Sequence, residues 1–317
     1  MVRLARRAEA AGFESAWVAE TRMTRDAFVP MAAIAQATER MHVGSAIVNV
    51  FNRSPMVIAV TLTSLRELAP HRVIGGLGAG SPLILGKQGI AFHRPVTRLR
   101  EYVQVLRPLL AGDPVTFSGE TIELDDVRIE DIAAGTSPGL GGGDVVPLYL
   151  GVTGPRALEL GGEVADGVLI NGFMSTAYVD RALDRIGRGA ARAGRALDDV
   201  DVCSLLVTSC DERSSVAKDR ARRLIAMYLS MFANIARESG LDESRVAHTR
   251  ERFQAGGIDA AAATIDDDIV DTLTVAGTPD ECAARMDAYR ARGVNHLVLS
   301  PIGDTHELVI DALGATC

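Results

Sequence analysis

The residues from Leu150 to Arg156 have types and spacing that could hold an anion. An apolar run ends in two glycines that flank a valine and a threonine, and a helical pattern begins at Pro155. Backbone N–H groups at the start of a helix, with a hydroxyl and a guanidinium nearby, favour a phosphate group. An ordinary capped turn with Arg156 in solvent accounts for the same residues, so spacing alone leaves both interpretations open.

A glycine-rich segment, Gly76–Gly80, also follows an apolar run and can be compared with the dinucleotide-binding fingerprint. The third glycine of G-x-G-x-x-G falls on Ser81, Pro82 comes next, and the pattern predicts no helix there. No acidic residue ends a strand at the expected distance. These departures argue against a Rossmann site, although glycines at a strand's carboxyl end let a flat ligand approach the backbone closely.

Metal-dependent and covalent chemistry are not indicated by local spacing. The histidines form no H-x-x-x-H or H-E-x-x-H arrangement, the cysteines form no C-x-x-C pair, and there is no G-x-S-x-G elbow. We therefore expect no metal ion and no covalent nucleophile. The residues considered are His42, His71, His93, His248, His296, His306, Cys203, Cys210, Cys282 and Cys317.

One acidic residue, Glu20, follows the strand that holds Trp17 and is a candidate catalytic group at the active face of a barrel. Behind it, Arg25 and Asp26 fit a structural ion pair or a helix cap better than a catalytic role.

The elements that position these residues alternate between short apolar strands and longer helical patterns, which is typical of a doubly wound sheet or a (β/α)8 barrel. Predicted strands are Ser15–Ala19, His42–Val48, Val73–Leu77, Val146–Leu150, Gly167–Ile170, Val200–Val207 and His296–Leu299. Predicted helices are Val2–Ala11, Pro55–Leu68, Pro155–Leu160, Ala177–Ala193, Ser214–Arg237 and Pro279–Arg292. Because a barrel normally opens on a strand, we expect its first strand to be missing from this chain.

Two excursions interrupt the alternation, about 79–146 and 241–271, and we expect residues 1–317 to form one barrel domain around them. The first excursion holds a predicted helix, Arg94–Leu110, and a hairpin that pairs Val115–Phe117 with Ile122–Leu124. Its glycine-rich part, Gly135–Gly143, is predicted to be a mobile loop.

The composition bounds the class of protein. A 47% hydrophobic content is enough for a large core, and a net charge of −8 argues against nucleic acid or an anionic membrane as partner. No run approaches the roughly 20 apolar residues of a membrane span. The sparse cysteines favour a reducing compartment, so we expect a cytoplasmic protein.

The stretch from His42 to Pro55 carries the strongest indication of a family. Together with Trp17–Glu20, Arg72–Gly80 and Ala165–Val168, it resembles the bacterial luciferase-like flavin-dependent oxidoreductases. Within them it resembles the deazaflavin branch, which includes the methylenetetrahydromethanopterin reductases. The resemblance extends from the first helix to about Pro301 and implies a TIM-like barrel.

The resemblance also implies a cofactor, coenzyme F420, at the carboxyl ends of the strands. A non-proline cis peptide between Ala46 and Ile47 would support the ring. The family often has Asp-His or Glu-His where this chain has Glu20-Thr21, so a histidine contact is absent. The cofactor-binding residues implied are Thr21, Ala46, Ile47, Asn49, Gly78, Ala79, Gly80, Gly151, Val152, Thr153, Gly154, Arg156 and Asn171.

The activity implied is hydride transfer between the deazaflavin C5 and an unidentified small organic substrate, with Glu20 as candidate general acid. Two alternatives stay open: an FMN-dependent monooxygenase of the same barrel, and a non-catalytic flavin-binding protein. A homodimer is expected by analogy with the family.

Overall fold

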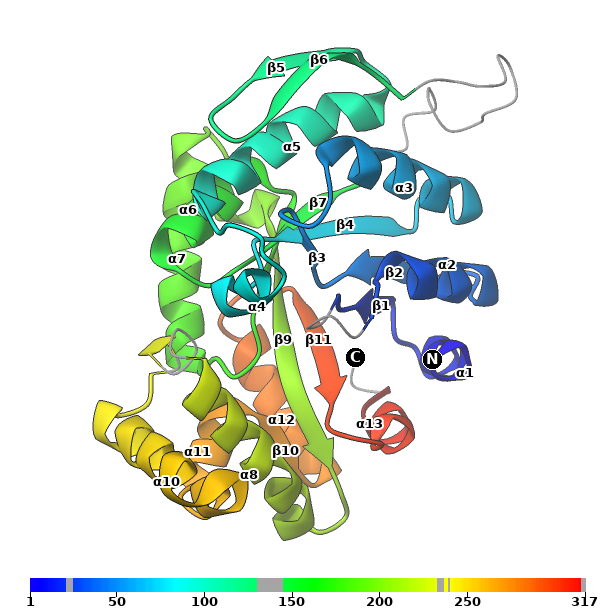
Figure 1. The fold of residues 1–317 in the computed structure, drawn as a ribbon. Helices are drawn as coiled ribbons and strands as arrows, with labels where there is room; N and C mark the ends of the chain where they lie inside the picture. The colour runs from blue at the N-terminus through cyan, green and yellow to red at the C-terminus, as the bar shows by residue number, and fades with distance from the viewer. Residues whose placement is uncertain (21–24, 130–144, 233–236, 239, 315–317) are drawn as a thin grey trace. The chain divides into compact units, whose positions relative to one another are not determined.

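A computed structural model describes residues 1–20, 25–129, 145–232, 237–238 and 240–314 (Figure 1). Strands and helices alternate along the chain, and every pairing outside one hairpin is parallel where its register is defined. The chain divides into two compact units. The first contains Met1–Val152, Arg156–Leu169 and Arg188–Val200; the second contains Thr153–Pro155, Ile170–Gly187 and Asp201–Cys317.

The strands of the first unit run in the order β1-β2-β4-β7-β8, and β3 pairs with β4. Their bounds are β1 Ser15–Val18, β2 His42–Ser45, β3 Val48–Asn49, β4 Val73–Gly78, β7 Leu148–Val152 and β8 Gly167–Ile170. The helices between them are α1 Val2–Ala10, α2 Phe28–Ala37, α3 Pro55–Leu68 and α6 Pro155–Val164. At α3 the local sequence explains the start, because Ser54 Oγ accepts the Val57 N–H and Pro55 occupies the first turn.

Aromatic side chains fill the spaces that glycines leave on these strands. The Trp17 ring covers Gly44, where an added Cβ would lie 2.6 Å from its Cε3, and the Tyr149 ring covers Gly167 in the same way. The two rings pack against each other with centroids 5.6 Å apart. Pairing large with small residues is how close packing is reached between neighbouring strands.

The first excursion contains α4 Pro82–Lys87, α5 Pro95–Ala111 and the antiparallel hairpin β5 Val115–Ser118 with β6 Glu123–Val127. Figure 1 shows the hairpin lying along α5. Buried Glu101 of α5 holds it there, because its carboxylate accepts the N–H groups of Glu120 and Thr121 at 2.6 and 2.9 Å. The predicted loop Gly135–Gly143 lies outside the described residues.

The second unit is built on the long strand β9, Asp201–Cys210, which pairs in parallel with β10 Val275–Gly277 and β11 His296–Pro301. Its further helices are α8 Ser214–Met231, α10 Glu243–Ala262, α11 Asp267–Leu273, α12 Pro279–Arg290 and α13 His306–Leu313, while α7, Thr176–Arg192, begins in this unit. The second excursion is thus α10, which packs along α8, with most of α11. None of the described helices is long and apolar enough to cross a membrane.

All seven predicted strands are present, but several elements were not foreseen. They include α2, the three-residue strand β10, helix α13, and α4, which opens at Pro82 where no helix was expected. The expected strand His42–Val48 is also divided into β2 and β3. Short elements such as α4 and β10 present too few residues for a period to show.

The carboxylate of Glu9 attaches α1 to the turn before β2. It accepts the N–H groups of Glu39, Arg40 and Met41 at 2.7–3.2 Å. Desolvation alone would raise the pKa of Glu9, but these hydrogen bonds lower it overall. Because the folded-state pKa is lowered, the stabilisation is present above the ordinary value of about 4.3 and is lost as pH falls through the folded-state value.

We expect Glu9→Gln to lower the free energy of unfolding by about 1 kcal/mol at pH 7, because the charged acceptor is replaced by a neutral one. The difference in the free energy of unfolding between Glu9→Gln and the parent protein should become smaller as the pH is lowered to 4. Urea unfolding at both pH values measures it, with exposed Glu67→Gln as the control for loss of a surface charge. An equal loss of stability at both pH values would contradict the role of the carboxylate.

Candidate functional site

Residues at the carboxyl ends of three neighbouring strands form a row in the first unit. Asn49 of β3 pairs with Gly78 of β4, and Gly78 pairs with Gly151 of β7. In parallel α/β folds the carboxyl ends of the strands are where ligands bind. The resemblance assigned all three residues to cofactor binding, and the structure brings them together.

The peptide bond between Ala46 and Ile47 is cis, as the resemblance implied. It lies between β2 and β3, and the Ile47 side chain extends across the glycines of the row. A Cβ added to Gly78 or to Gly151 would lie 2.5 Å from Ile47 carbon atoms. Both positions must therefore lack a side chain for Ile47 to lie where it does.

Ser45 holds the last residue of β2 against β4. Its hydroxyl donates to the Gly76 carbonyl at 2.8 Å and accepts the Gly76 N–H at 2.9 Å. A Cβ on Gly76 would lie 1.8 Å from the Ser45 carbonyl oxygen. The fully buried serine therefore replaces ladder hydrogen bonds at the point where β2 ends.

Asn49 is fixed at both its backbone and its side chain. Its N–H donates to Glu20 Oε2 at 3.1 Å, and its Oδ1 accepts the Phe51 N–H at 2.7 Å. The side-chain nitrogen lies toward Gly80, since a Cβ on Gly80 would be 2.1 Å from it. Gly80 has a φ of +69°, which glycine adopts without the strain other residues meet.

Glu20 belongs to an ion-pair group with Arg53 and Asp26. Arg53 donates to Glu20 Oε1 at 2.7 Å and also pairs with Asp26. Burial by itself would lower the pKa of Arg53, but hydrogen bonds and charge attraction from both carboxylates raise it overall. Asp26 precedes Ala27, the N-cap residue of α2, and accepts the Val29 N–H of the first turn at 2.8 Å. Its ion pair is with Arg53, which the sequence did not indicate, and not with the neighbouring Arg25 that was expected.

Two side chains of α5 hold the loop between Asn49 and α3. Arg98 donates to the Val50 carbonyl at 2.9 Å, and its guanidinium lies 5.0 Å from the Phe51 ring centroid. Tyr102 donates its hydroxyl hydrogen to the Arg53 carbonyl at 2.5 Å. Neither residue was predicted from the sequence, because they lie 48 and 49 positions after the residues they hold and no local pattern connects them.

The predicted phosphate turn falls between β7 and α6. Gly151 and buried Val152 end the strand, and exposed Arg156 lies in the first turn of α6. A Cβ on Gly154 would meet no atom within 4 Å. Within the second unit, the Thr153 carbonyl accepts the Tyr178 hydroxyl hydrogen at 2.5 Å.

The remaining predicted residues have separate positions. Asn171, which follows β8, accepts the Gly172 N–H on its own side chain at 2.9 Å. Ala79 lies between Gly78 and Gly80 and is half-buried. Thr21 lies outside the described residues.

These features define an α/β protein whose polar and glycine residues gather where parallel strands end, the arrangement of a barrel enzyme site. The profile of the luciferase-like monooxygenases matches residues 1–296, and the chain belongs to this family.

Similar proteins and a similar solved structure match this chain over nearly its whole length. The 5,10-methylenetetrahydromethanopterin reductase of Methanolobus tindarius is 31% identical over 98% of this chain and 93% of its own. The F420-dependent glucose-6-phosphate dehydrogenase of Amycolatopsis mediterranei is 27% identical over 97% and 90%. The structure of the F420-dependent tetrahydromethanopterin reductase from Methanopyrus kandleri superposes with a TM-score of 0.87 at 26% identity, covering 99% of this chain and 92% of that one. The fold is therefore the TIM-like barrel that the sequence predicted.

We expect Gly76→Ala to lower the free energy of unfolding by at least about 2 kcal/mol, because its Cβ would overlap the Ser45 carbonyl. Gly86→Ala is the matched control, since a Cβ there meets nothing within 4 Å. In helix α4 this change should be neutral or stabilising by up to about 1 kcal/mol. Urea unfolding measures both. Similar stability for the two variants would contradict the close approach of β2 to β4.

Proposed function

We propose that this protein is an F420-dependent oxidoreductase that transfers a hydride between the cofactor and a small organic substrate. The observation that carries the proposal is the row of Asn49, Gly78 and Gly151 under Ile47, at the positions expected from the resemblance. The names of similar proteins support it, since methylenetetrahydromethanopterin reductases and F420-dependent dehydrogenases match nearly the whole chain. F420, when bound, supplies the hydride at its C5 carbon.

The residues present suit a flat ring with a phosphate-bearing tail. Ile47 is fixed against two glycines and offers a firm apolar surface. Asn49 offers a side-chain amide whose orientation is set by its bond from Phe51. Open space beside Gly154, just before a helix begins, suits a phosphate group. We propose that Ala46, Ile47, Asn49, Gly78, Ala79 and Gly80 contact the ring, and that Gly151, Val152, Thr153, Gly154 and Arg156 contact the tail. The roles of Thr21 and Asn171 stay predictions.

For Glu20 we propose a positioning role. One carboxylate oxygen accepts from Arg53 and the other accepts from the Asn49 backbone. In this arrangement donors face both oxygens, and the group orients Asn49 while Arg53 balances its charge. The assignment of Glu20 as general acid stays a prediction, and substitution separates the two roles.

The substrate class we propose first is a methylene-tetrahydropterin. Its support is the agreement of relatives from Methanolobus tindarius, Archaeoglobus fulgidus and Methanopyrus kandleri, all of them 5,10-methylenetetrahydromethanopterin reductases, at 27–31% identity. Glucose 6-phosphate is the next class to assay, because two of the similar dehydrogenases act on it. The homodimer and the cytoplasmic location stay predictions.

We expect the purified protein to bind F420 at least tenfold more tightly than FMN, measured by fluorescence titration. We also expect it to catalyse transfer of the hydride between the C5 carbon of F420 and a methylene-tetrahydropterin. Asn49→Ala should weaken F420 binding about tenfold, because a directed side-chain donor is lost. Asn52→Ala is the control, since Asn52 is exposed in the same loop.

Three outcomes would contradict parts of this proposal. Tighter binding of FMN with oxygen consumption would favour the monooxygenase alternative. Binding of F420 without turnover of any assayed substrate would leave a binding protein. Equal affinities for the two asparagine variants would remove Asn49 from the cofactor site.

Glu20→Gln distinguishes positioning from proton donation. If Glu20 positions Asn49, the Kd for F420 should rise about threefold to tenfold, while kcat at saturation and its pH profile stay nearly unchanged. Loss of a general acid would instead lower kcat by about 10²–10⁴-fold and remove one limb of the pH profile. Steady-state kinetics across pH measure both, with exposed Glu14→Gln as the control.

A further inference from the structure

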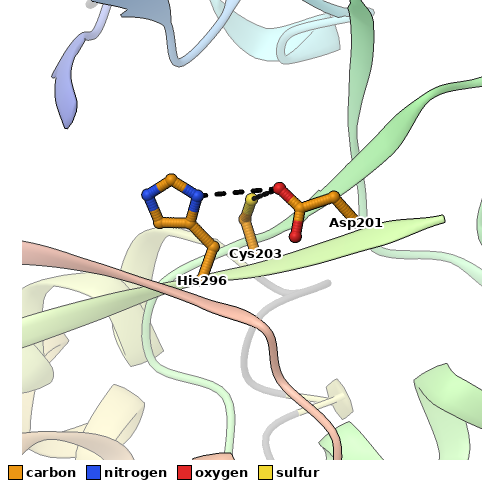
Figure 2. Close-up of side chains that lie close together, drawn as sticks. All are labelled: Asp201, Cys203 and His296. Atoms are coloured by element: carbon orange, nitrogen blue, oxygen red, sulfur yellow. Dashed lines mark hydrogen bonds and ion pairs between the residues drawn. The ribbon is translucent and has the colours of Figure 1, made fainter. Parts of the chain in front are cut away.

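Three side chains that carry metal-binding atoms meet at the start of β9 and β11 (Figure 2). Cys203 Sγ lies 3.5 Å from Asp201 Oδ2, and His296 Nδ1 lies 3.6 Å from the same oxygen. All three donor atoms lie within 4.8 Å of one another. Among the residues that the structure describes, this is the one such group of three or more.

The strands bring these residues together by their period and register. Asp201 and Cys203 are two positions apart on β9, so their side chains lie on one face of the sheet. His296 pairs directly with Cys203 across the parallel ladder and therefore shares that face. Local spacing in the sequence does not indicate this group, because His296 lies on a strand 93 positions after Cys203 and meets it only through the strand register.

The distances agree with a tetrahedral zinc ion. Bonds of about 2.3 Å to sulfur and about 2.0 Å to oxygen or nitrogen place sulfur and oxygen about 3.5 Å apart, and oxygen and nitrogen about 3.3 Å apart. The separations of 3.5 and 3.6 Å in this group require only a small side-chain adjustment. A thiolate, an imidazole and a carboxylate are the ligand types that zinc takes in proteins.

We propose that Asp201, Cys203 and His296 form a zinc site with three protein ligands and one position for water. Cys203 is fully buried, whereas the Asp201 and His296 side chains are 29% and 25% exposed, so an ion can reach the group from the exposed side. Binding displaces the thiol proton into solvent. The site joins the first residues of two paired strands, at the end of barrel strands that serves stability and not catalysis.

The cysteine needs the ion's charge to become a ligand. A bound divalent cation supplies this charge, because a coordinating thiol is deprotonated. Without metal the same residues form a polar group in which the thiol donates to the carboxylate.

Cobalt titration of the tag-free, chelator-treated protein tests the proposal. We expect one Co²⁺ per chain, with visible bands of a tetrahedral ion and a near-ultraviolet charge-transfer band from the thiolate, and we expect Zn²⁺ to abolish both. Cys203→Ala should lose the charge-transfer band, and His296→Gln should weaken cobalt affinity at least tenfold. Cys282→Ala is the matched control, because its thiol is also fully buried in the second unit.

Several results would overturn the zinc site. They are the absence of the charge-transfer band in the parent protein, its survival in Cys203→Ala, or its equal loss in Cys282→Ala. Circular dichroism of each variant establishes that it is folded. If Cys203→Ala does not fold, His296→Gln decides, because it retains the thiol: unchanged cobalt affinity in that variant would refute the site.

Discussion

The close approach of the Ser45 carbonyl to Gly76 is the constraint on which the candidate site depends. A Cβ at position 76 would lie 1.8 Å from that oxygen, so no side chain can be present there. The Ser45 hydroxyl then donates one hydrogen bond to the Gly76 carbonyl and accepts one from the Gly76 N–H. Both backbone groups of Gly76 therefore have a partner without a regular strand ladder. The chain can therefore leave β2, pass through Ala46 and Ile47, and return as β3 beside the same strand β4.

A second set of interactions keeps the chain after β3 in place, and it is made of charged and polar side chains. Arg53 lies between two carboxylates, while its own carbonyl accepts from Tyr102 and the Val50 carbonyl accepts from Arg98. Partly buried ion pairs stabilise only when their geometry is good and their remaining groups are satisfied. Here the pairing orients the polar part of the loop, while buried Val50 and the packing of Phe51 against Phe92 supply its apolar contacts.

The sequence predicted the strands and most long helices because valine and isoleucine runs and helical periods are local signals. The resemblance to the family assigned Asn49, Gly78 and Gly151 to the cofactor, and each of them lies at the end of a predicted strand. The partners that hold these residues could not be predicted in the same way. Arg98 and Tyr102 come from a helix in an excursion, and the pairing of Cys203 with His296 requires the register of two strands more than 90 residues apart. Tertiary register is not encoded in any short window of sequence, so residue spacing indicates neither the contacts of Arg98 and Tyr102 nor the pairing of Cys203 with His296.

The glycine content of β4 explains why polar anchors are needed at this edge. Glycine weakens a strand because it loses more conformational entropy on folding and has no side chain to pack. Leucine side chains compensate at Gly75, where Leu62 and Leu148 would meet an added Cβ at 2.9 and 3.0 Å. At Gly78 and Gly151 the compensation comes from Ile47, and at Gly80 it comes from Asn49. The residues proposed to contact a ligand are thus the same ones that fill the spaces beside the glycines. A substitution that enlarges Gly78, Gly151 or Gly80 would move Ile47 or Asn49, so packing and binding at this edge are expected to change together.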